Sequence, residues 1–140
     1  LHHSSLSTCI FGILACEIGY YEEAYTYFTQ SARMDLDDYH NNFYAGIHAA
    51  NMAGTWQAIV NGFAGLRTNA GCLELHPYLP SQWKGYTFKI NYQGSRLEVS
   101  VKEDGTQITL EQGNAVSFKL NNTEYHLAKE GDIVHESKTI

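Results

Sequence analysis

Basic residues are scarce in this chain, and their scarcity excludes one class of function. The 140 residues include 9 Lys and Arg against 15 Asp and Glu, a formal net charge of −6. A nucleic-acid-binding surface neutralises phosphates with clustered Lys and Arg, and the sequence holds no such cluster. We therefore expect no nucleic-acid partner.

Long apolar runs and paired cysteines are lacking as well. No run approaches the roughly 18 apolar residues of a membrane-spanning helix, so we expect no membrane partner. Three cysteines, Cys9, Cys16 and Cys72, are too few for a disulfide framework, and reduced thiols indicate a cytoplasmic protein. The chain begins with Leu1 and no signal-peptide pattern, which we interpret as part of a longer polypeptide.

The first half of the chain has the period of helices. Serines at positions 4, 5 and 7 predict the start of a helix that runs to about Ile18. Apolar residues surround this first helix almost completely, as expected for a helix buried in a larger assembly. A single apolar stripe predicts a second helix; its members are Tyr21, Ala24, Tyr25, Phe28 and Ala32.

A run rich in glycine, residues 46–66, predicts the third helix, from about Ile47 to Gly65. It contains four glycines together with His48 and Trp56. A glycine inside a helix costs about 1 kcal/mol relative to alanine. Several glycines within one helix therefore indicate that a neighbouring backbone or a ligand approaches the helix closely.

From about Arg67 onward the apolar period changes to two. Apolar residues alternate with polar ones over 86–92 and 97–101, and turn residues such as Gly94 and Gly105 separate the runs. This pattern predicts a series of antiparallel hairpins with one buried face. The fold class we expect is α + β, with helices first and strands second.

Several motifs, in their order along the chain, carry a family resemblance. They are residues 3–7, the 46–66 run, Leu75-His76-Pro77, and Trp83. With them the chain resembles the C-terminal part of glycoside hydrolase family 65, which contains maltose, trehalose, kojibiose and nigerose phosphorylases. The resemblance implies that residues 1–70 are the last helices of an (α/α)6-barrel catalytic domain. Residues 71–140 would form a small C-terminal antiparallel β-sheet or sandwich domain.

The resemblance also implies a reaction, inverting phosphorolysis. Inorganic phosphate would attack the anomeric carbon of an α-linked, maltose-like glucose disaccharide and give β-glucose 1-phosphate and glucose. The general-acid Glu would lie upstream, so no catalytic residue is assigned in this chain, which alone should be inactive. Phosphate would be a co-substrate, with no further cofactor and no metal. The expected partners are the disaccharide, phosphate, the remainder of the same polypeptide and a second subunit of a homodimer.

Phosphate binding is the role that the resemblance leaves to this chain. Carried over by motif, the ligands are Ser4, Ser5, Ser7 and His48. Hydroxyls and backbone N–H groups at a helix start donate to anions, and an imidazolium adds charge. From spacing alone His48 could be purely structural, and at least one of the serines is expected to cap a helix.

Other polar groups favour structural interpretations. Thr55, Trp56 and Gln57 could line a sugar site, but Trp56 is expected in the core. The acidic cluster at 35–38 with His40 lacks the spacing of a calcium loop, so we predict a solvated loop there.

Two further functions compete with a phosphorylase. One is a trehalase-like hydrolase of the same family, which would use a second carboxylate to activate water. The other is a non-catalytic carbohydrate-binding or structural module in the strand half. Its aromatic platform would be Tyr86, Tyr92 and Tyr125, although the alternation of 86–92 favours the core.

Overall fold

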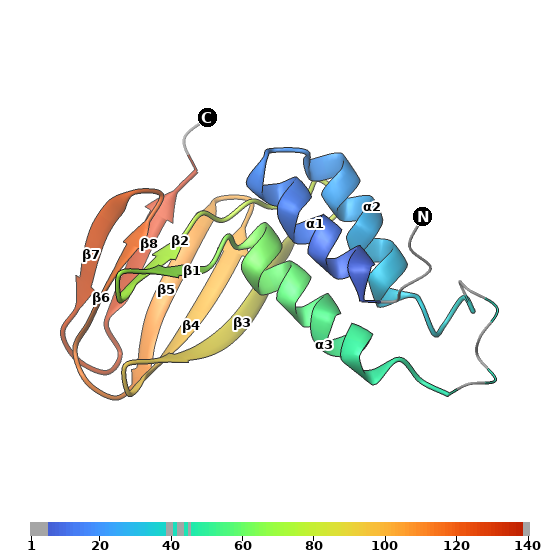
Figure 1. Cartoon of the computed structure of the whole chain (residues 1–140). Coiled ribbons are helices and arrows are strands. Elements are labelled where there is room, and N and C mark those ends of the chain that lie inside the picture. Colours follow the sequence, from blue (N-terminus) through green and yellow to red (C-terminus); the bar gives the residue numbers. More distant parts are fainter. Residues whose placement is uncertain (1–5, 39–40, 42–43, 45, 139–140) are drawn as a thin grey trace. The chain divides into compact units, whose positions relative to one another are not determined.

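The computed structural model describes residues 6–38, 41, 44 and 46–138. The chain divides into two compact units, one ending at Phe63 and the other beginning at Ala64. The first is built from helices and the second from strands (Figure 1). The predicted α + β class is therefore confirmed, and the boundary lies a few residues before Arg67, where the apolar period of the sequence changes.

The helical unit contains three α-helices and one π-helical segment among the residues described. They are α1 (Ser7–Glu17), α2 (Tyr21–Ala32), α3 (Ala49–Gln57) and the π-helical η2 (Ala58–Phe63). The single helix predicted over 47–65 is thus an α-helix that continues as a π-helix, and the prediction was wrong in treating it as uniform. No helix in the described part of the chain is long and apolar enough to cross a membrane.

Glycines let α1 lie directly against α3 and η2. A Cβ atom added to Gly54 would lie 2.5 Å from the Cys9 sulfur, and one at Gly62 would lie 3.4 Å from the Cys16 sulfur. Close approach by a neighbouring helix, predicted from the glycine content, is confirmed at Gly54. Because Cys9 precedes Cys16 as Gly54 precedes Gly62, α1 runs parallel to α3 and η2.

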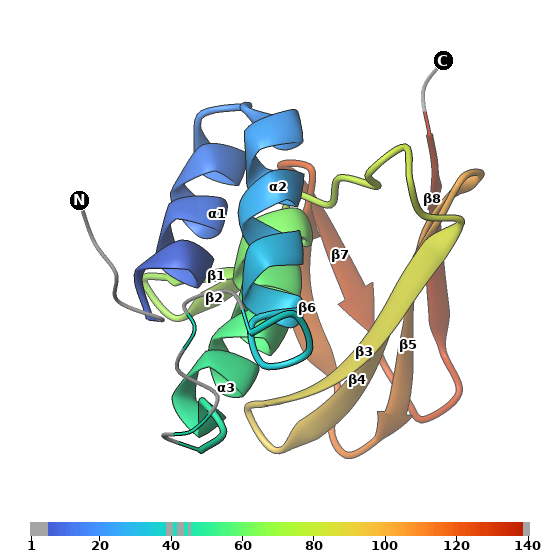
Figure 2. The same cartoon turned by 90° about the vertical axis from the view of Figure 1, so that its right-hand side faces the viewer.

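The strand unit contains two four-stranded sheets. Sheet 1 has the order β1-β2-β6-β7, and sheet 2 has the order β3-β4-β5-β8. The strands of sheet 1 are β1 (Arg67–Asn69), β2 (Cys72–Leu75), β6 (Val116–Leu120) and β7 (Thr123–Leu127). The strands of sheet 2 are β3 (Gly85–Tyr92), β4 (Ser95–Lys102), β5 (Gly105–Gln112) and β8 (Ile133–Ser137), seen side by side in Figure 2.

One strand pairing departs from the predicted hairpin series. β2 pairs with β6 in parallel, whereas the other pairings are antiparallel. β5 pairs with β8, although β6 and β7 lie between them in the chain. The strand unit is therefore rich in antiparallel pairs but not purely antiparallel. β6 and β7 belong to sheet 1, and the chain then returns to sheet 2 with β8.

The core of the strand unit follows the period-two pattern. In β4 the side chains of Leu97, Val99 and Val101 are buried, whereas those between them are partly or fully exposed. The apolar residues of β5 and β6 alternate in the same way. Burying one face of each strand fixes the register, because a slip of one residue would turn every apolar side chain to the other face.

Candidate functional site

Three helix ends meet at one end of the helical unit (Figure 1). The parallel course of α1 and α3 brings their starts to the same end, and Ser31 near the end of α2 bonds to Asn51 in the first turn of α3. At about 1.5 Å per residue, Ser7 lies about 3 Å before Cys9 along its helix, and His48 lies about 9 Å before Gly54. The sequence-predicted residues Ser7 and His48 therefore lie toward the same end.

Of the three serines of the predicted site, only Ser7 lies among the described residues. Ser4 and Ser5 lie outside the described residues. Ser7 is the first residue of α1 and is half-buried. The N-cap of α1 is Leu6, and no side chain makes a capping hydrogen bond there. A capping role for Ser7 is therefore wrong, because its own backbone is already helical.

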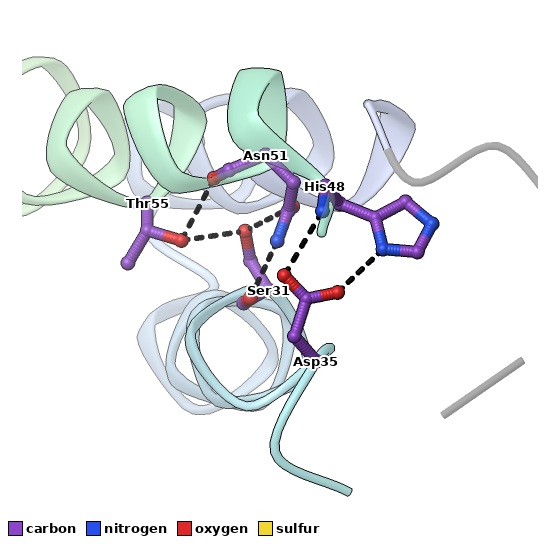
Figure 3. Close-up of polar contacts among 5 residues, drawn as sticks. All are labelled: Ser31, Asp35, His48, Asn51 and Thr55. Carbon is purple, nitrogen blue, oxygen red and sulfur yellow. Dashed lines mark hydrogen bonds and ion pairs between the residues drawn. The ribbon is translucent and has the colours of Figure 1, made fainter. Parts of the chain in front are cut away.

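His48 stands immediately before α3, as its N-cap, and is clamped by Asp35 (Figure 3). The Asp35 Oδ1 atom lies 2.5 Å from His48 Nδ1, and Oδ2 accepts the His48 backbone N–H at 3.0 Å. The two side chains are 17% and 18% exposed. Both oxygens of one carboxylate thus hold one residue, which fixes the direction of the imidazole ring as well as the start of the helix.

The charge of Asp35 determines where the imidazole carries its proton. Hydrogen bonds from the His48 side chain and backbone hold the pKa of Asp35 below its ordinary value of 3.8. An ionised carboxylate can only accept hydrogen bonds, so Nδ1 of His48 must carry a hydrogen. Any contact of the ring with a ligand is thereby directed to its other nitrogen, Nε2.

A buried polar network connects α2 with α3 beside this clamp (Figure 3). The Ser31 hydroxyl donates to Asn51 Oδ1 at 2.7 Å, and Asn51 Nδ2 donates to the Ser31 carbonyl at 2.7 Å. The Thr55 hydroxyl lies 3.0 Å from that of Ser31. Because Asp35 follows α2 and His48 precedes α3, the network fixes the two elements that carry the clamp.

The electrostatics of the helix starts differ within the unit. The first turn of α2 contains Glu22 and Glu23, whereas the first turns of α1 and α3 contain no acidic residue. The partial positive charge of a helix start attracts anions, and acidic side chains in the first turn compensate it. The start of α1 therefore keeps a potential that favours an anion, whereas at the start of α3 the ionised Asp35 carboxylate accepts the His48 backbone N–H and offsets part of that potential.

The predicted solvated loop at 35–38 is wrong for Asp35. Asp35 binds His48, whereas Asp37 pairs with Arg33 at 2.6 Å on the surface. His40, the remaining member of that cluster, lies outside the described residues. No set of three His, Cys, Asp or Glu that could hold a metal occurs in the described parts of the chain.

The candidate sugar-contacting residues are dispersed. The Thr55 hydroxyl belongs to the buried network, whereas the Trp56 side chain is 50% exposed, so its predicted place in the core is wrong in this chain. The hydroxyls of Tyr86, Tyr92 and Tyr125 each bond to a different partner: the Tyr78 carbonyl, the Gly71 carbonyl and Glu136. They do not combine into one aromatic platform.

Two profiles of one family match successive parts of the chain. Residues 1–57 match "Glycosyl hydrolase family 65 central catalytic domain", and residues 66–127 match "Glycosyl hydrolase family 65, C-terminal domain". The interval between the two matches contains Phe63 and Ala64, where the chain passes from the first compact unit to the second.

Phosphorylases of several bacteria are similar to almost the whole chain. Alpha,alpha-trehalose phosphorylase of Geobacillus stearothermophilus is 47% identical over 129 residues, which are 92% of this chain and 17% of that protein. Maltose phosphorylase of Bacillus subtilis (strain 168) is 40% identical over 120 residues, 86% of this chain and 16% of that protein. The solved structure "Putative kojibiose phosphorylase from human microbiome" superposes with a TM-score of 0.90 at 36% identity, over 99% of this chain and 18% of that one. The chain thus spans about a sixth of the length of the curated relatives it matches.

Proposed function

Because the chain belongs to glycosyl hydrolase family 65, we propose that it serves as the C-terminal part of a phosphorylase acting on an α-linked glucose disaccharide. Inorganic phosphate attacks the anomeric carbon of a maltose-like substrate with inversion, giving β-glucose 1-phosphate and glucose. The helical unit, which ends at Phe63, supplies the last helices of an (α/α)6 barrel, and the strand unit, which begins at Ala64, forms the C-terminal domain. The complete enzyme is a cytoplasmic homodimer that uses no cofactor and no metal.

The exposed apolar face of α1 supports a partner from the same polypeptide. Leu6, Ile10, Leu14 and Ile18 follow one another at intervals of four residues, and each is about half exposed or more. Residues four apart share one face of a helix. Such a face is stable in water only when it is covered, and the upstream barrel helices are the occupants that this proposal supplies.

The observation that carries the phosphate assignment is the clamp on His48. The ring is held by Asp35 at the start of a helix whose first turn has no acidic residue. An imidazolium in that place adds a charge-assisted hydrogen bond to the attraction of the helix start. Ser7 at the start of α1 contributes a hydroxyl and a backbone donor at the same end of the unit, and Ser4 and Ser5 are assigned with it by the sequence motif alone.

Asp35 is a positioning residue in this proposal. By accepting the Nδ1 hydrogen it presents Nε2 to the phosphate, and by accepting the backbone N–H it fixes the ring at the helix start. Phosphate takes the place that activated water has in an inverting hydrolase, so a second catalytic carboxylate is not required. The general-acid Glu lies upstream of this chain.

The test is a product assay on the complete enzyme that carries this chain. Maltose, trehalose and kojibiose are each incubated with and without inorganic phosphate, and glucose and β-glucose 1-phosphate are quantified. We expect β-glucose 1-phosphate in amounts equal to the free sugar, with no reaction when phosphate is omitted. Release of glucose alone, at a rate independent of phosphate, would replace the proposal with a trehalase-like hydrolase.

A further inference from the structure

A cavity lies in the strand unit, at the ends of three strands of sheet 2. Its volume is about 390 Å³, within the range of small-molecule sites. The floor contains Val101 and Thr106, which face each other across β4 and β5 and are 3% and 6% exposed. The walls come from the segment around Tyr78 and from Asn121 in the turn between β6 and β7.

Glu136 of β8 adds a carboxylate to the row formed by Val101 and Thr106. It lies opposite Thr106 in the register of β5 and β8 and lines the cavity. Two neutral donors hold it, one from the turn between β6 and β7 and one from β7: Asn121 Nδ2 at 2.6 Å from Oε2, and the Tyr125 hydroxyl at 3.2 Å from Oε1. Across the described ranges, no Lys or Arg lies within ion-pair distance of Glu136.

Tyr125 keeps its proton and donates to this carboxylate. Burial, reinforced by the nearby charge of Glu136, raises the pKa of Tyr125. A carboxylate offers about four acceptor positions, of which these two contacts use only part. Glu136 therefore retains the capacity to accept further hydrogen bonds from a ligand, in a direction fixed by Asn121 and Tyr125.

The chemistry of the lining fits a neutral polyol. Hydroxyl groups would donate to Glu136 and exchange hydrogen bonds with the Thr106 hydroxyl, while Tyr78 and Val101 supply apolar contact for C–H groups. An anion would be repelled by Glu136, whose partners are neutral. Lys102 and Lys138 also line the cavity but are exposed side chains, so they lie nearer to solvent than the buried floor does.

We propose that this cavity is a carbohydrate subsite of the strand unit, which takes one neutral hexose unit and binds its hydroxyls through Glu136 and Thr106. None of the residues that line it is among those assigned to phosphate, which lie at positions 4–48. The site gives the strand unit a ligand of its own, independent of the reaction. A few hydrogen bonds to one sugar unit correspond to a dissociation constant on the order of millimolar.

The test is an amide-resolved NMR titration of the isotope-labelled 140-residue chain with maltose and, separately, with glucose. We expect saturable shifts at Thr106, Asn121 and Glu136, with the amides of α3 unaffected. Glu136→Gln should weaken binding about tenfold, the loss of one hydrogen bond to a charged group. Glu103→Gln is the matched control, since Glu103 is exposed and does not line the cavity, and it should bind as the parent chain does.

A second variant covers the case in which Glu136→Gln fails to fold. Thr106→Val keeps the side-chain shape and removes the hydroxyl, and it should weaken maltose binding severalfold while the amide spectrum stays dispersed. Absence of saturable shifts around the cavity in the folded parent chain would overturn the proposal. Stronger binding of β-glucose 1-phosphate than of maltose, strengthened further by Glu136→Gln, would overturn it too, because the cavity would then be an anion site.

Discussion

Replacement of Asn51 by alanine tests the connection between α2 and α3. The Asn51 side chain is buried, with 3% exposure, and makes two hydrogen bonds of 2.7 Å to Ser31. Ser31 is not left unpaired by the change, because its hydroxyl keeps Thr55 and its carbonyl keeps the N–H of Met34. The cost is therefore the loss of two buried hydrogen bonds and a small void, about 2–3 kcal/mol.

The assay is amide hydrogen exchange of the labelled chain, because it reports the helical unit separately from the strand unit. We expect the protection of the α2 and α3 amides to fall by about 2–3 kcal/mol in Asn51→Ala, with the strand amides unchanged. Gln57→Ala is the matched control: this exposed amide on the same helix should change protection by less than about 0.5 kcal/mol. Equal effects of the two variants would refute the assigned role of the network.

Two further predictions concern the same unit. Gly54→Ala should destabilise the helical unit by about 1–3 kcal/mol despite the better helix propensity of alanine, because the new Cβ atom would lie 2.5 Å from the Cys9 sulfur. In urea unfolding, the double variant with Cys9→Ala should recover part of the lost stability. Additive losses of stability from the two substitutions would contradict this packing. Asp35 stabilises the folded state while it is ionised, so its contribution is present above pH 3.8 and is lost as the pH falls through its lower folded-state pKa. Acid unfolding of Asp35→Asn should therefore be less steep than that of the parent chain, and identical profiles would exclude the clamp.

Local sequence patterns predicted the helices well. The stripe from Tyr21 to Ala32 gives the bounds of α2, since its five apolar residues lie on one face. The glycine at position 54 predicted close packing, and a cysteine of α1 supplies it. Burial of one face is encoded within a few turns of chain, so a single sequence is enough to read it.

Pairings between distant segments were not predictable in the same way. The sequences of β7 and β8 contain charged residues and alternate only weakly between apolar and polar residues. β8 pairs with β5, although β6 and β7 lie between them in the chain. The clamp joins Asp35 to His48 across 13 positions, and only the antiparallel arrangement of α2 and α3 brings them together. An acidic loop residue gives no signal of its own that it will meet a histidine.

The dependence of the complete enzyme on phosphate, measured with His48→Ala, tests the central claim most directly. If His48 binds phosphate, the variant should raise KM for phosphate about 30- to 100-fold, the loss of a charge-assisted hydrogen bond, while KM for the disaccharide changes little. Asp35→Asn should raise the same constant less and shift its pH profile. An unchanged KM for phosphate in a folded His48→Ala enzyme would contradict the assignment.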